Sequence, residues 1–113
     1  MSSLNPARII ATTELTATAV ALYTVAVSTQ CVIRTIALAN HSVASQTTTV
    51  YFVPSGGTAD DTTTVIKEIA VPAKTTIVLD GLKGLLLIAG ESIYMEASNA
   101  NDITVTASGT EIT

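Results

Sequence analysis

The chain has 113 residues and a formal net charge of −4; 12% of its residues are charged and 4% are aromatic. This length corresponds to a single domain that buries a core without disulfides or metals. The five basic residues are scattered, so the sequence offers no phosphate-tracking surface, and we expect no nucleic-acid partner. So low a charge content is typical of a subunit in an assembly rather than a freely diffusing monomer.

Targeting and membrane segments are also not expected. The first six residues have neither the basic start nor the apolar run of a signal peptide. The longest apolar stretch, residues 85–89, has the length of a strand and is far short of the ~20 residues that a membrane helix needs. The sequence therefore predicts a soluble chain, made in a cytoplasm, with no membrane partner.

The first part of the chain favours extended structure throughout. Residues 1–10 are predicted to be an extended N-terminal arm, and residues 11–113 a single β-sandwich domain. Apolar and polar residues alternate weakly over residues 8–15. Residues 16–27 are also assigned to a strand, because residues 22–25 alternate and their neighbours are threonine and valine. Residues 30–40 are the clearest strand. Its alternation places Val32, Arg34, Ile36 and Leu38 on one face and Cys31, Ile33, Thr35, Ala37 and Ala39 on the other.

The second part of the chain repeats short strands between strong turn signals. The predicted strands are residues 47–53, 63–71, 75–80, 92–98 and 103–112, separated by segments rich in Pro, Gly, Asn and Asp. No helix of useful length has caps and periodicity together. The predicted fold is all-β: one antiparallel β-sandwich, jelly-roll or immunoglobulin-like, of about 7–9 strands.

Residues for catalysis are scarce. His41 is the one histidine and lies in a turn, and no Gly-x-Ser-x-Gly elbow supplies it with a nucleophile. Cys31 is the one cysteine, so an internal disulfide is excluded, and its apolar strand favours a buried, inert thiol. One Cys and one His do not make a zinc site, and residues 55–57 precede no helix that could hold phosphate. We predict no enzyme, no catalytic, metal or cofactor-binding residues, and no small-molecule substrate.

Two binding alternatives remain open. The adjacent carboxylates of Asp60 and Asp61 could hold Ca²⁺ in their loop, although such pairs are more often simply solvated. Tyr23, Tyr51 and Tyr94 could serve as platforms of a carbohydrate-binding, host-adhesion module, although tyrosines in strands are more often half-buried packing residues.

Six segments occur in an order that is similar to that of a known family. They are residues 21–25, 36–40, 50–57, 71–76, 87–93 and the Thr/Val strand that ends at Ser108-Gly109. Over about residues 18–112 the chain thereby resembles small bacteriophage virion proteins that are encoded among head and tail genes. One departure is Ala26-Val27-Ser28, where relatives often have a Pro-Ala-Gly turn.

The resemblance implies a non-enzymatic virion structural protein. The leading hypothesis is a capsid decoration (cement) protein that binds and stabilises the capsid lattice, with the major capsid protein or other virion subunits as partners. The alternatives are a tail, neck or fibre-associated subunit and the carbohydrate-binding module described above. The chain is expected to be a homo-oligomer in the virion, and residues 1–10 to add a strand to a neighbour or to lie in its groove.

Overall fold

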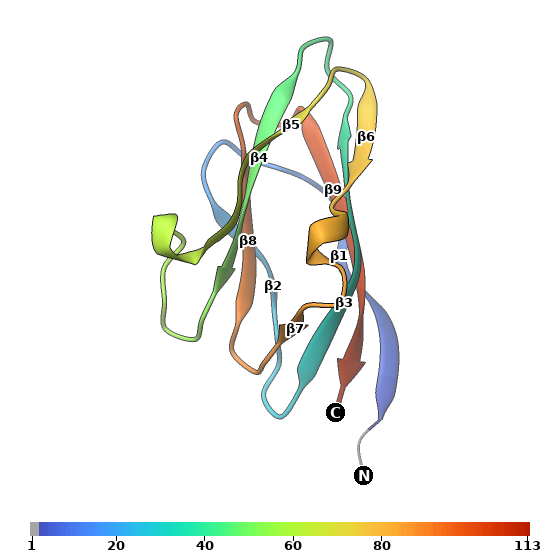
Figure 1. The fold of residues 1–113 in the computed structure, drawn as a ribbon, viewed down its shortest axis with the longest axis vertical. Helices are drawn as coiled ribbons and strands as arrows, with labels where there is room; N and C mark the ends of the chain where they lie inside the picture. The colour runs from blue at the N-terminus through green and yellow to red at the C-terminus, as the bar shows by residue number, and fades with distance from the viewer. Residues whose placement is uncertain (1–2) are drawn as a thin grey trace.

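The computed structural model describes residues 3–113, which form nine strands in two antiparallel sheets, and Figure 1 shows the sheets as two layers. The five-stranded sheet has the order β1-β9-β3-β6, with the short β7 also paired to β3, and the four-stranded sheet has the order β2-β8-β4-β5. The strands are β1 Leu4–Glu14, β2 Val20–Thr24, β3 Gln30–Asn40, β4 Gln46–Val53, β5 Thr64–Val71, β6 Thr75–Val78, β7 Leu86–Leu87, β8 Ser92–Ala97 and β9 Ile103–Ile112. Two 3₁₀ turns, η1 Asp61–Thr63 and η2 Asp80–Leu82, complete the structure.

This strand order is that of a jelly roll. When the short β7 is set aside, the first, last, third and sixth strands form one sheet, and the remaining strands form the other. The prediction of one all-β antiparallel sandwich is therefore confirmed, and the topology selects the jelly roll over the immunoglobulin-like arrangement. Within residues 3–113 no helix has the length and apolar character needed to cross a membrane.

The core lies between the two sheets and follows from two-residue alternation. In β9 the buried side chains of Ile103, Val105 and Ala107 alternate with half-buried residues, most of them threonines, that face outward. From the opposite sheet, Ile93 and Met95 of β8 fill the same interior with no exposed surface. β-Branched and other apolar side chains of this size suit the inner face of a pleated sheet, so the sandwich needs few aromatic residues.

Strand β3 changes its inward-facing side part-way along its length. Its pairing with β9 shifts register between Ile33 and Thr35, which marks a β-bulge. The buried side chains are Cys31 and Ile33 before the bulge and Ile36 and Leu38 after it. The predicted unbroken alternation is therefore wrong, because the extra residue turns all later side chains to the other face. Arg34, predicted to share a face with Ile36, lies exposed at the bulge.

The predicted N-terminal arm is extended, but it is part of the sandwich. Residues 4–10 belong to β1, which pairs with β9 from Leu4 opposite Ile112 to Glu14 opposite Thr104. Ile9 and Ile10 are buried in the core, and this burial holds the segment on its own chain. The segment is therefore an edge strand of the five-stranded sheet and not a separate arm, and the expectation that it adds a strand to a neighbour or lies in its groove stays a prediction. Residues 1 and 2 of the predicted arm lie outside the described residues.

Candidate interaction surface

The structure keeps the two candidate chemical residues apart. His41 follows the end of β3, is more than half exposed, and has its Nε2 atom 4.0 Å from Oε1 of Glu14. Cys31 lies near the other end of β3, fully buried, and this burial raises the pKa of its thiol. Residues 3–113 contain no group of three or more His, Cys, Asp or Glu side chains that could hold a metal ion. The arrangement provides neither a nucleophile with a base nor a metal-ligand set.

Tyr23 points into the sandwich and links its two sheets. From β2 in the four-stranded sheet, its hydroxyl donates a hydrogen bond of 2.7 Å to Oε2 of Glu111 on β9, in the other sheet. Burial, and then this hydrogen bond, raise the pKa of Tyr23 well above its usual range. A tyrosine held in this way packs the interior and is not available as a platform for a sugar ring.

Tyr51 and Tyr94 lie opposite each other on β4 and β8. The hydroxyl of Tyr51 donates to Oε1 of Glu96, and this hydrogen bond, together with burial, raises the pKa of Tyr51 to about 12. Only 5% of Tyr51 is exposed, and Tyr94 is half-buried. With Tyr23 turned inward, the three tyrosines do not form a common exposed surface.

The carboxylates of the β4–β5 loop are occupied by contacts within the chain. Asp60 caps η1: its Oδ1 accepts from the backbone N–H of Thr62 at 2.9 Å, and its Oδ2 accepts from the hydroxyl of Thr58 at 2.9 Å. The hydroxyl of Thr62 also donates to Oδ1, and this hydrogen bond, followed by those from the Thr58 hydroxyl and the Thr62 backbone, lowers the pKa of Asp60. Asp61 lies 3.4 Å from the ammonium group of Lys67. The loop is thus an N-cap next to an exposed ion pair.

We predict that calcium does not stabilise the chain. A calcium ion in this loop would compete with the capping hydrogen bonds of Asp60 and with the Lys67 ammonium group. The thermal midpoint in millimolar Ca²⁺ is expected to lie within about 1 °C of that in EDTA. A calcium-dependent rise that disappears in the Asp60→Asn/Asp61→Asn variant would contradict this prediction.

An apolar patch lies on the outer face of the five-stranded sheet, near the two termini. In one outward-facing row across the strands, Ile112 lies between Leu4 and Gln30. In the next outward-facing row, Val32 lies between Thr110 and Leu86. Leu4, Leu86 and Ile88 are 70%, 50% and 51% exposed. We define the terminal apolar patch as Leu4, Val32, Leu86, Ile88 and Ile112.

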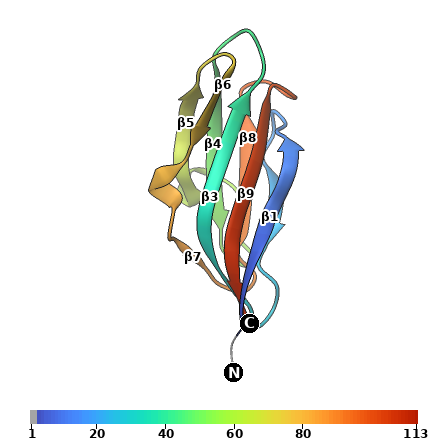
Figure 2. The same ribbon diagram turned by 90° about the vertical axis from the view of Figure 1, so that its right-hand side faces the viewer.

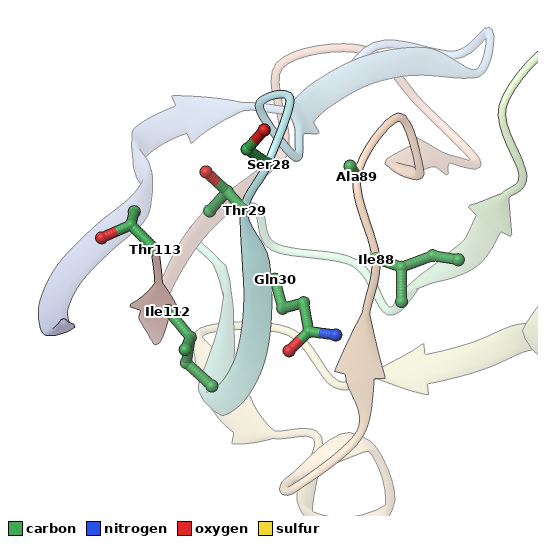
Figure 3. Close-up of a pocket in the computed structure, with 7 residues that line it drawn as sticks. All are labelled: Ser28, Thr29, Gln30, Ile88, Ala89, Ile112 and Thr113. Atoms are coloured by element: carbon green, nitrogen blue, oxygen red, sulfur yellow. The ribbon is translucent and has the colours of Figure 1, made fainter. Parts of the chain in front are cut away.

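A hollow of about 600 Å³ opens at this patch. Figure 3 shows Ile112, Gln30 and Ile88 in a row across β9, β3 and the segment after β7, with their side chains pointing to the same side. The lining residues are Ser28, Thr29, Gln30, Ile88, Ala89, Ile112 and Thr113. Ile88, Ala89 and Ile112 give this hollow an apolar part that is suited to receive an apolar group.

The sequence points to part of this patch but not to its exposure. The apolar run at residues 85–89 is visible in the sequence, yet alternation alone does not say which of its side chains face solvent. The pairing of β7 with β3 buries Leu87 and leaves Leu86 outward. A contiguous patch of exposed leucine and isoleucine side chains is typical of a contact site for another protein.

Comparison with solved structures finds the same fold in proteins of low sequence identity. The chain is similar to one from "Bacillus endospore appendages form a novel family of disulfide-linked pili", with a TM-score of 0.57 and 12% identity over 98% of this chain and 88% of that one. It is also similar to a chain of infectious bursal disease virus, Gx strain, with a TM-score of 0.51 and 16% identity over 99% of this chain and 32% of the virus chain. The chain thus spans about a third of that virus chain's length. At these identities the likeness shows the fold alone.

The sequence itself matches no protein-family profile and no curated protein.

Proposed function

We propose that this chain is a non-enzymatic structural subunit that enters an assembled particle by packing the outer face of its five-stranded sheet against another subunit. The terminal apolar patch carries this proposal. It holds Leu86 and Ile88 half exposed at a sheet edge where β7 is fixed by pairing with β3. Full burial of an exposed side chain of this size contributes about 1.5–3 kcal/mol, and because Leu86 and Ile88 are half exposed, covering each of them contributes roughly half of that.

Two further observations support an assembling role. Only 12% of the residues are charged, which is low for a surface that meets only water. The two solved structures compared above are those of a pilus and a virus, and they provide an analogy at the level of the fold.

Within this class we favour a bacteriophage virion protein, and in particular a capsid decoration protein that stabilises the capsid lattice. The ordered resemblance over residues 18–112 supports this assignment. Its partner would be the major capsid protein, and its location the virion. A tail, neck or fibre-associated subunit is the second candidate; copy number separates the two, since decoration requires on the order of hundreds of copies per particle and a tail or neck part far fewer.

A carbohydrate-binding module is less well supported. Tyr23 is engaged between the sheets and Tyr51 is nearly covered, so two of its three proposed platforms are not free. A glycan array probed in the presence of calcium tests this alternative directly.

The test of the proposal combines particle stability with binding. Particles that lack the subunit are expected to rupture at a lower temperature than particles that carry it. The Leu86→Asp/Ile88→Asp variant is expected to lose particle binding, because two carboxylates would then be buried in the contact. Val43→Asp/Ala44→Asp is the matched control, since it adds the same two carboxylates at exposed positions in the loop after β3, away from the patch.

Equal rupture temperatures with and without the subunit would count against decoration. Unchanged binding by the Leu86→Asp/Ile88→Asp variant, with native circular dichroism, would count against the patch as the contact. Turnover of a substrate by the purified chain would overturn the structural role itself.

A further inference from the structure

Two arginines without ionic partners lie on the outer face of the five-stranded sheet, next to the terminal apolar patch. Arg8 of β1 and Arg34 of β3 stand on either side of β9, and with Ser108 and Thr110 they line a hollow of about 480 Å³. Both arginines are exposed. Among residues 3–113 the ion pairs are His41–Glu14 and Lys67–Asp61, so neither arginine has a carboxylate partner within the described chain. Guanidinium groups in such a position are well suited to bind carboxylates of another molecule.

The outer face of the four-stranded sheet has the opposite charge. Glu68 of β5 and Glu96 of β8 line one hollow of about 220 Å³, together with Thr47 and Thr49 of β4. Lys67 also lines this hollow, but its ammonium group is engaged by Asp61 at 3.4 Å. Tyr51 binds Oε1 of Glu96, which leaves Oε2 for another donor. The two hollows, one on each broad face, therefore carry complementary charges.

We infer that copies of this chain stack on one another, with the outer face of the five-stranded sheet of one copy on the outer face of the four-stranded sheet of the next. Arg8 and Arg34 then face the carboxylates of Glu68 and Glu96 of the neighbouring copy. This inference rests on the proposed structural function: within the stack a second copy covers the patch, and the five-stranded sheet that stays free at one end of the stack is the face that packs against the capsid.

The charges disfavour the symmetric alternatives. Two copies joined through their five-stranded sheets would bring arginines toward arginines, and two joined through their four-stranded sheets would bring carboxylates toward carboxylates. Like charges across a contact repel, whereas the mixed contact pairs opposite charges. Because the mixed contact is heterologous, each added copy leaves one face of each kind free, and the stack continues.

The outline of the face is comparable in size to a standard protein–protein contact. Figure 2 shows β3, β9 and β1 side by side on this face, which is viewed along the axis of intermediate length. The molecule extends 49 Å and 20 Å in the plane of this view. This outline amounts to at most roughly 1,000 Å², compared with about 800 Å² that each partner buries in a standard-size interface.

The experiment measures association of the purified chain by sedimentation velocity at low and high salt. The wild-type chain is expected to form species larger than dimers as concentration rises at low salt, and Arg8→Glu/Arg34→Glu to raise the dissociation constant by at least about tenfold. Lys74→Glu/Lys83→Glu is the matched control, because it changes the net charge equally while altering lysines that line neither of the two hollows. This control is expected to associate like the wild type.

A charge exchange tests the pairing itself. Glu68→Lys/Glu96→Lys alone is expected to be as defective as Arg8→Glu/Arg34→Glu, and an equimolar mixture of the two variants is expected to restore association. If Glu96→Lys impairs folding, as judged by circular dichroism, Glu68→Lys and Arg34→Glu serve as the pair. A chain that stays monomeric at about 1 mM, a closed dimer, or association unaffected by charge reversal would overturn the inference. A monomeric chain that still binds particles through Leu86 and Ile88 would keep the proposed function and lose only the stacking.

Discussion

Replacing either Ile33 or Ile36 by alanine is expected to lower the free energy of unfolding by about 2–5 kcal/mol. Both side chains are completely buried, although their spacing of three residues would place them on opposite faces of a regular strand. The register shift between Ile33 and Thr35 turns both toward the core. Urea denaturation of each variant at neutral pH measures the effect.

The neighbouring outer-face residues provide the control. Arg34→Ala and Val32→Ala are expected to cost less than about 1 kcal/mol, because Arg34 is exposed and Val32 is half-buried on the outer face. A regular strand would instead make one of the two isoleucine substitutions nearly neutral. That result would show that β3 has no bulge. If Ile33 is the neutral position, Arg34 would also point away from the face where stacking requires it.

Unfolding free energy is expected to fall steeply above about pH 10 because of Tyr23 and Tyr51. Both phenols have a folded-state pKa raised above the ordinary 10.0, that of Tyr51 to about 12. Their contribution is complete below the unfolded pKa and is lost as pH rises through the folded pKa, since the unfolded chain ionises first. The loss is at most about 1.4 kcal/mol per pH unit for each tyrosine, and less where solvent screens the Glu96 carboxylate.

Tyr23→Phe separates the contribution of Tyr23. At pH 7 the variant is expected to lose about 1–3 kcal/mol, because Glu111 loses its hydrogen-bond donor between the sheets. Above pH 10 its stability is expected to fall less steeply than that of the wild type, since one ionisable phenol is gone. Urea unfolding at pH 7 and at several values between about 9 and 11 measures both effects. An unchanged alkaline slope would show that Tyr23 does not stay protonated in the folded chain.

Much of the fold follows from local sequence. The alternation of residues 103–112 predicted β9 and its buried face, and the turn residues at 54–57 and 99–102 predicted the ends of β4 and β8. Because the sequence contains one His and one Cys, we predicted that it has no metal or catalytic site. Within residues 3–113 the structure brings no metal-ligand cluster together. That prediction stays a prediction, because no ligand has been tested.

Other features could not be predicted from local sequence. The side chain of Tyr23 points inward because its hydroxyl donates a hydrogen bond to Glu111, which is distant in sequence. The bulge in β3 depends on its pairing with β9. The pairing of β5 with β4 is also irregular, and there Glu68 has a φ of 50°. Two-residue alternation over residues 63–71 therefore does not predict which charged side chains of β5 face outward.

Local sequence is enough to specify a small, weakly charged β-sandwich, because two-residue periodicity of β-branched side chains is a property of each strand alone. Which strands are neighbours depends on the folded chain, in which residues 4–14 pair with β9 and Leu86 faces outward beside Val32. It also placed Arg8 and Arg34 on one face and Glu68 and Glu96 on the other. These outcomes depend on hydrogen-bond register between strands far apart in the chain, and a shift of one residue in register reverses which side chains a face presents.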